Sequence, residues 1–146
     1  RFDYTTDAFA AVDSSGTLWA WGSPYFLKDI FTTGITEPVA LMDDVEQVSL
    51  VETGYTGAVL AVKEDHTLWG MGSLGYLGFP ENDPESFSAT PVKLMDNVKA
   101  VSGGSSGAMV LKQDGSLGIW AAPLTVSWVT VLSTPTPPTA RPGPIM

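Results

Sequence analysis

The sequence predicts an all-β fold built from repeated units of about fifty residues. The phrase Thr-Leu-Trp-Gly-Met-Gly at 67–72 recurs as Thr-Leu-Trp-Ala-Trp-Gly at 17–22 and, more loosely, as Ser-Leu-Gly-Ile-Trp-Ala at 116–121. These phrases begin 50 and 49 residues apart, and self-similarity at a fixed period of that size is the signature of a repeat protein. A second phrase, at 38–49, is echoed at 91–102. The chain is therefore a short array of similar units.

Each unit contains a β-hairpin whose second strand is rich in aromatic side chains. Apolar runs on either side of an Asp-Ser-Ser-Gly turn predict the first hairpin at 8–21. The same pattern predicts hairpins at 58–71 and 108–120. The polar turns at 43–44 and 96–97 separate two further short strands, so each unit holds about four strands.

One turn position holds Gly16, His66 and Gly115 in the three hairpins. A left-handed backbone explains this set, because glycine adopts it freely and histidine is among the few side chains enriched there. We therefore interpret His66, the only histidine, as a turn residue and not as a catalytic base or metal ligand.

The hairpin strands are apolar on both faces. Leu18 and Leu68 fall on one face, and the opposite face carries Trp19, Trp21, Trp69 and Met71. Both faces of such strands must be covered, which a stack or ring of β-blades achieves. In an isolated array we expect an exposed apolar face around Leu18, Trp19 and Trp21, and a tendency to associate.

Composition limits the classes of partner. Seven basic and sixteen acidic side chains give a net charge of −9, which repels nucleic acid and anionic membranes. No apolar run reaches the roughly 20 residues of a membrane helix, and the chain begins at Arg1 without a signal-like stretch. We therefore expect no nucleic-acid binding and no membrane insertion, and we interpret the chain as a fragment of a longer protein. The absence of cysteine excludes a disulfide framework, and it is compatible with either an oxidising or a reducing compartment.

The joint order of the phrases resembles the repeat of the regulator of chromosome condensation (RCC1) family. That order is Pro-Val-x-Leu, Val-x-x-Val-Ser, a Gly/Ser-rich loop, Asp-Gly and Leu-Trp-x-Trp-Gly, and the resemblance covers residues 7 to about 120. Met71 and Gly118 depart from the aromatic residues that the family prefers. Family members are β-propellers of about seven blades. The resemblance implies a partial β-propeller of about 2.5 to 3 four-stranded blades, with units near 1–49, 50–102 and 103–120, the last incomplete.

The resemblance leaves several functions open. The best-known activity of the family is guanine nucleotide exchange on a GTPase, other members are interaction scaffolds, including secreted or cell-surface bacterial proteins, and one similar propeller inhibits a β-lactamase. We expect a non-catalytic protein–protein interaction module, with exchange on a small GTPase or enzyme inhibition as the alternatives. A secreted or cell-surface bacterial protein is favoured, although the sequence does not fix the location.

No group of residues forms a convincing catalytic or cofactor site. The glycines at 102–107 lack the Gly-Lys-Ser/Thr of a phosphate loop and fit a connector better. The acidic stretch at 81–85 lacks the ligand spacing of a calcium loop and fits a solvated connector. The adjacent Asp43 and Asp44 fit a turn better than a general acid and base. We expect no enzyme activity, no cofactor and no metal.

The two long connectors, at 22–37 and 72–90, differ in length and are rich in aromatic side chains. Variable loops on a fixed strand frame commonly carry recognition, and aromatic anchors among polar neighbours are typical of binding hot spots. The predicted contacts with a protein partner are Tyr25, Phe26, Phe31, Tyr76, Phe79 and Phe87.

Residues 121–146 form a Pro/Thr-rich tail of different character. It contains six of the eleven prolines, no acidic residue, and Arg141 as its only charge. We interpret the tail as a frameshift product, because losing one base after Trp120 converts a Trp-Gly-Ser-Pro phrase like that at 21–24 into the observed Trp-Ala-Ala-Pro. A proline-rich linker is the alternative. In the first case 135–144 is irregular, and the nucleotide sequence of the gene tests it.

Overall fold

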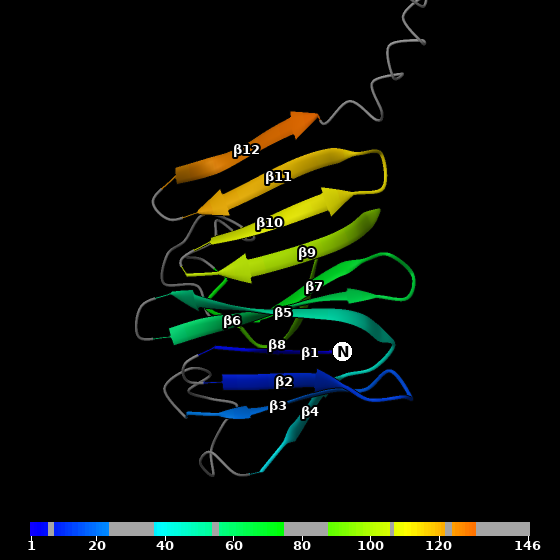
Figure 1. Ribbon diagram of the computed structural model, residues 1–146, viewed down its shortest axis with the longest axis vertical. Helices are drawn as coiled ribbons and strands as arrows, with labels where there is room; N and C mark the ends of the chain where they lie inside the picture. The colour runs from blue at the N-terminus through cyan, green and yellow to red at the C-terminus, as the bar shows by residue number, and fades with distance from the viewer. Residues whose placement is uncertain are drawn as a thin grey trace, which may run out of the picture.

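The computed structural model describes residues 1–5, 8–23, 37–53, 56–74, 88–105, 107–121 and 124–130. In this part of the chain the strands form three four-stranded antiparallel sheets and no helix (Figure 1). The first sheet contains β1 (Phe2–Tyr4), β2 (Ala8–Val12), β3 (Leu18–Gly22) and β4 (Val39–Met42). The second contains β5 (Val45–Thr53), β6 (Thr56–Lys63), β7 (Leu68–Gly72) and β8 (Ser88–Met95), and the third β9 (Val98–Gly104), β10 (Gly107–Lys112), β11 (Ser116–Ala121) and β12 (Leu124–Thr130). The predicted all-β partial propeller is confirmed.

The three predicted hairpins are β2–β3, β6–β7 and β10–β11, and their turns lie together at one edge, on the right in Figure 1. The turns at 43–44 and 96–97 lead from one sheet to the next, from β4 to β5 and from β8 to β9. The sheets therefore begin several residues before the sequence units near 50–102 and 103–120. The repeat pattern fixes a period, but its starting point is arbitrary until strand pairing is known.

The third sheet has a fourth strand in the segment that the sequence analysis assigned to the tail. β12 pairs antiparallel with β11, and Gly118 lies opposite Trp128. The segment reads Leu-Thr-Val-Ser-Trp-Val-Thr, and β-branched and aromatic residues of this kind favour strands. An edge strand also needs only backbone hydrogen bonds to its neighbour. Residues 131–146 lie outside the described residues, and the origin of the tail remains a prediction.

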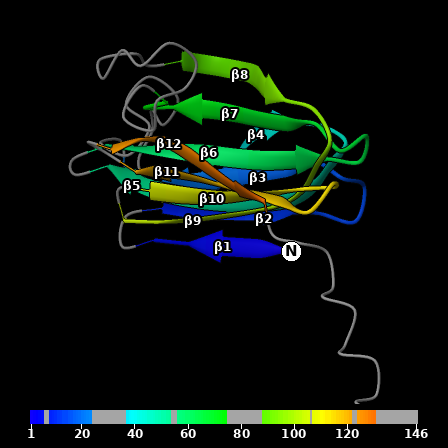
Figure 2. The same cartoon turned by 90° about the horizontal axis from the view of Figure 1, so that it is seen from above.

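The core lies in two layers between the sheets, which lie over one another in Figure 2. Side chains packed between the first and second sheets include Ala10, Leu18, Leu50, Val59 and Ala61. Those between the second and third include Leu60, Val62, Leu68, Val98 and Val110. Leu18 is fully buried, so the expectation that it is exposed with Trp19 and Trp21 is wrong for this residue. The reason is strand alternation, which points Leu18 at the second sheet and the tryptophans away from it.

Two hydrogen bonds recur between successive sheets. The backbone N–H of Leu50 in β5 donates to the Asp3 carboxylate in β1 at 2.8 Å, and the N–H of Gly103 in β9 donates to the Ser49 hydroxyl in β5 at 2.6 Å. At the hairpin turns, Val45 N donates to the Gly16 carbonyl at 2.9 Å and Val98 N to the His66 carbonyl at 2.8 Å. The same bonds thus join the first sheet to the second and the second to the third.

Candidate functional site

Both long connectors start and end at one edge of the sheets, which we call the connector edge. Because neighbouring strands are antiparallel, the carboxyl ends of β1, β3, β5, β7 and β9 all lie at the edge opposite the hairpin turns. The connector from β3 to β4 therefore leaves at this edge, as does the connector from β7 to β8. The six aromatic residues predicted to contact a partner lie within these connectors, at positions outside the described residues.

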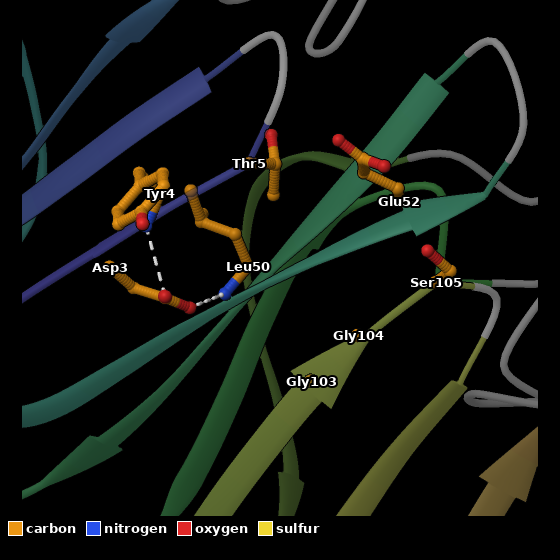
Figure 3. A pocket seen from close by; sticks show the side chains of 8 residues that line it. All are labelled: Asp3, Tyr4, Thr5, Leu50, Glu52, Gly103, Gly104 and Ser105. Atoms are coloured by element: carbon orange, nitrogen blue, oxygen red, sulfur yellow. Dashed lines mark hydrogen bonds between the residues drawn. The ribbon is translucent and has the colours of Figure 1, made fainter.

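A cavity of about 310 Å³ opens at the connector edge between β1, β5 and β9 (Figure 3). It is lined by Asp3, Tyr4, Thr5, Leu50, Glu52, Gly103, Gly104 and Ser105. An isolated parallel bridge between Glu52 and Ser105 joins the second and third sheets at its rim. Three sheets that are distant in sequence thus supply one cavity, and the sequence analysis did not find it. Its residues share no motif, and the repeat phrase places only some of them at equivalent positions.

The cavity is acidic in its lining but holds no evident catalytic pair. Asp3 and Glu52 are its two carboxylates, and no cationic side chain is among the lining residues. The Asp3 carboxylate accepts hydrogen bonds from the N–H groups of Tyr4 at 2.9 Å and Leu50 at 2.8 Å and from the Ser49 hydroxyl at 3.3 Å. Through its bonds to Ser49 and Leu50, Asp3 links the first sheet to the second. The cavity presents hydrogen-bond acceptors and is suited to binding polar or basic groups.

The opposite edge carries His66, at the tip of the β6–β7 hairpin. Its φ of 67° matches the values of 87° at Gly16 and 90° at Gly115, so the left-handed turn inferred from the sequence is present. Ser105 lies at the connector edge and His66 at the hairpin edge, which keeps the two side chains apart. Within the described residues no group of three or more His, Cys, Asp or Glu side chains could hold a metal ion.

The aspartates of the hairpin turns cap their own turns. Hydrogen bonds from the Ser15 hydroxyl and then the Trp19 indole hold the pKa of Asp13 far below its ordinary value. The Thr67 hydroxyl lowers the pKa of Asp65, and the Ser116 hydroxyl lowers that of Asp114. Donors aimed at a carboxylate favour its ionised form.

Asp43 and Asp44, in the turn between β4 and β5, also have structural roles. The Asp43 carboxylate accepts a hydrogen bond from the Thr17 hydroxyl at 3.0 Å, and Asp44 has a φ of 60°. Both observations fit the turn interpretation of this pair.

The outer face of the first sheet carries a row of aromatic rings, of which Tyr4 and Phe9 are exposed and Trp21 is half-buried. Tyr4, Phe9 and Trp21 lie on β1, β2 and β3, with ring centroids 6.4 Å apart for Tyr4 and Phe9 and 5.8 Å for Phe9 and Trp21. Phe2 and Tyr4 are 79% and 68% exposed. The sequence analysis placed Trp19 and Trp21 on an exposed face but missed the contribution of β1, because that strand precedes the recognisable repeat.

The structure is similar to known propellers, although no protein-family model and no curated protein sequence matches the chain. Human WBSCR16 is similar with a TM-score of 0.63 and 21% identity, over 83% of this chain and 32% of that one. Yeast RCC1 (Prp20) crystallised with Kap60 gives 0.63 and 20%, over 83% and 31%. Prp20p of Saccharomyces cerevisiae, studied with its binding to Gsp1p and histones, gives 0.63 and 20%, over 82% and 30%. The chain thus has the fold of RCC1-like propellers and spans about a third of their length.

Within the described residues, no helix has the length and apolar character needed to cross a membrane.

Proposed function

We propose that this chain is a non-catalytic protein-interaction module of an RCC1-like β-propeller, and that the connector edge is its contact surface. The observation that carries this proposal is the anchoring of both long connectors at the edge where the cavity between β1, β5 and β9 opens. The connectors are rich in aromatic residues, and the cavity is lined by the two carboxylates of Asp3 and Glu52. This combination of apolar anchors and polar partners is typical of protein interfaces.

The partner is a protein surface that presents hydrogen-bond donors or basic side chains. Asp3 and Glu52 supply acceptors in the cavity, and the net charge of −9 attracts a basic partner over long range. Two similar structures concern propellers with protein partners, since yeast Prp20 is bound to Kap60 in one and was studied for binding to Gsp1p and histones in the other. They support the class of partner and leave its identity open.

The test is affinity capture with the longest natural chain that contains this sequence, followed by calorimetry with the captured protein. We expect Tyr76→Ala and Phe26→Ala each to weaken binding by about tenfold or more, the usual result of truncating an aromatic hot spot. Gln113→Ala is the matched control, because Gln113 is exposed at the hairpin edge. Equal affinities for all three variants would contradict a contact surface at the connector edge.

Guanine nucleotide exchange is the second candidate function, favoured by the likeness to yeast RCC1. A nucleotide-release assay with a panel of small GTPases separates it from simple binding. We expect no acceleration of release. Acceleration that is lost in Tyr76→Ala would keep the proposed surface and replace the proposed function.

A further inference from the structure

Each of the three sheets ends on its outer side in an edge strand, and these edge strands are β4, β8 and β12. β12 is the outermost strand of the third sheet in Figure 1. Within the described residues no fifth strand pairs with any of these edges. A free edge presents unpaired backbone N–H and C=O groups, which form a template for a further strand. The sheets pack through their faces (Figure 2), so further sheets of a longer polypeptide would leave the outer edges open.

Two of the outer strands carry features that hinder strand addition. β4 has only four residues, and its pairing with β3 shifts register once. β8 is longer but contains Pro91 and Lys93, and its pairing with β7 shifts register twice. Short length, proline, lysine and bulges are the features by which proteins protect sheet edges from other chains. The edges of β4 and β8 are therefore poor templates.

β12 lacks most of these features. Its seven residues read Leu-Thr-Val-Ser-Trp-Val-Thr and include no proline, glycine or charged residue. Its pairing with β11 is regular from Ser127 to Thr130, and the one register shift lies near the start of the strand. Uncharged segments of this length that are rich in β-branched and aromatic residues are typical of strand addition between chains. Among the outer strands of the described sheets, β12 thus has the unprotected edge.

The rest of the chain offers no suitable strand to cover this edge. Residues 131–146 follow β12 directly but contain five prolines, and proline has no N–H to donate to a sheet edge. The inner strands β1, β5 and β9 are already linked to one another by hydrogen bonds between sheets. The occupant must be an extended segment that lacks proline and charge and has a free edge of its own. β12 of a second copy meets each of these requirements.

We infer that β12 is a strand-addition surface, on which β12 of a second copy of this chain pairs edge to edge. A two-fold axis relates the two copies, so the two strands run antiparallel and each supplies donors and acceptors to the other. The two four-stranded sheets then form one continuous sheet, and main-chain hydrogen bonds supply the affinity. This surface is separate from the connector edge, and the inference does not rest on the proposed function.

The frameshift interpretation of residues 121–146 agrees with an unprotected edge. Natural sequences protect their edge strands because pairing between copies leads to aggregation. A segment translated in a shifted frame has had no such selection. The inference depends only on the sequence of β12 and on its place in the sheet, so it holds for either origin of the tail.

Sedimentation velocity on the longest natural chain that contains this sequence gives the first test. We expect a monomer in equilibrium with a two-copy species. Ser127→Lys should raise the dissociation constant about fivefold or more, because it brings lysines of the two copies together on paired strands. Gln113→Lys makes the same change of charge at an exposed hairpin turn and should leave the constant unchanged. A chain that stays monomeric, or equal dissociation constants for the two variants, would overturn the inference.

Hydrogen exchange on the wild-type chain gives the second test, which needs no variant. Above the dissociation constant, amides of residues 124–130 that point away from β11 should become protected, whereas those of the turn at 113–115 should exchange as in the monomer. A two-copy species without added protection in β12 would place the contact elsewhere and overturn the inference. Protection of β10 in Ser127→Lys checks that the third sheet is intact. Partner binding at the connector edge is measured separately, so this inference and the proposed function can fail independently.

Discussion

The second sheet and the first sheet contain the same hairpin 50 residues apart, yet their burial differs. In β6 and β7 fully buried side chains lie on both faces, with 0% exposure for Val59, Leu60, Ala61, Val62 and Leu68. In β2 and β3 only alternate residues are buried: Ala8 and Ala10 are 1% exposed, whereas Phe9 between them is 41% exposed. The apolar pattern is a property of the repeat, but the sheets packed against each sheet decide which of its faces is buried.

The tryptophan of each hairpin shows a second difference between these sheets. The Trp19 indole donates to the Asp13 carboxylate at 2.9 Å, whereas the Trp69 indole donates to the Thr67 hydroxyl at 2.8 Å. The position of Asp13 is held in the second hairpin by Lys63, whose ammonium lies 4.6 Å from the centre of the Trp69 ring. The fold thus requires a partner for the indole N–H but does not fix which polar group supplies it.

The largest expected effect comes from truncating a leucine of the doubly covered sheet. Leu68→Ala should lower the free energy of unfolding by about 2 to 5 kcal/mol, because a cavity remains where the buried side chain was. Phe9→Ala on the exposed face of the first sheet is the matched change and should cost about 1 kcal/mol or less. Urea unfolding followed by tryptophan fluorescence measures both. If the two variants lose equal stability, the first sheet is covered in solution as the second is.

A smaller effect is expected at Gly103, where the second and third sheets are in close contact. A Cβ on Gly103 would lie 2.5 Å from Cγ2 of Val51 and 2.7 Å from the carbonyl oxygen of Leu50, whereas a Cβ on Gly104 would meet nothing within 4 Å. Gly103→Ala should therefore cost about 1 to 3 kcal/mol by overpacking, and Gly104→Ala should be nearly neutral. Thermal unfolding of the two variants checks this. Similar melting temperatures would mean that the sheets can separate there at little cost.

The turn position shared by the first two hairpins predicts effects of opposite sign. Gly16→Ala should destabilise by about 1 kcal/mol, because alanine must adopt a φ of 87°. The space around Gly16 is adequate, with the nearest atom 3.6 Å from an added Cβ, so the cost is one of backbone strain. His66→Gly should be neutral or stabilising, since glycine adopts the φ of 67° without strain. A loss of stability in His66→Gly would show that the imidazole makes a contribution of its own.

The smallest effect is a pH dependence from the exposed carboxylates of the turns. Asp13, Asp65 and Asp114 have folded pKa values below the ordinary 3.8. Their contribution to stability is therefore complete above pH 3.8 and is lost as the pH falls through the lower folded values. The urea midpoint should be constant from pH 7 to about pH 5 and fall in more acidic buffer.

Two variants of the second hairpin isolate one carboxylate. Thr67→Val removes the hydroxyl that lowers the pKa of Asp65, and should reduce the acid dependence, while Thr67→Ser retains the hydroxyl and should keep it. Equal acid dependence in both variants would assign the effect to other groups.

Much of the fold was predictable because its signals are local and repeated. The period of the phrase, the two-faced apolar strands and the turn position of His66 predicted an all-β array with four strands per unit, and the structure confirms it. The hairpins lie where their turn residues placed them. The bounds of the sheets were less accessible, because a repeat has no intrinsic start, and β12 lies in a segment without the repeat phrase.

The candidate site was less predictable. The cavity at the connector edge combines Asp3, Glu52 and Ser105 from three sheets, and no spacing in the sequence links residues that meet only when sheets stack. Asp3 is the clearest example, because its hydrogen bond with the N–H of Leu50 joins residues that are 47 positions apart in the sequence.

By itself, the sequence determined the strands of the repeated hairpins, their turns and the need to cover both faces, since these follow from side-chain periodicity and from the backbone conformations that glycine and a few other residues allow. Only the tertiary structure decided which faces are covered, where one sheet ends and the next begins, and which residues meet at the connector edge. The physical reason is that burial and hydrogen bonding between sheets depend on distances between residues about fifty positions apart. The local sequence pattern specifies the hairpin strands of each blade, and the packing between sheets specifies which faces of the blade are buried.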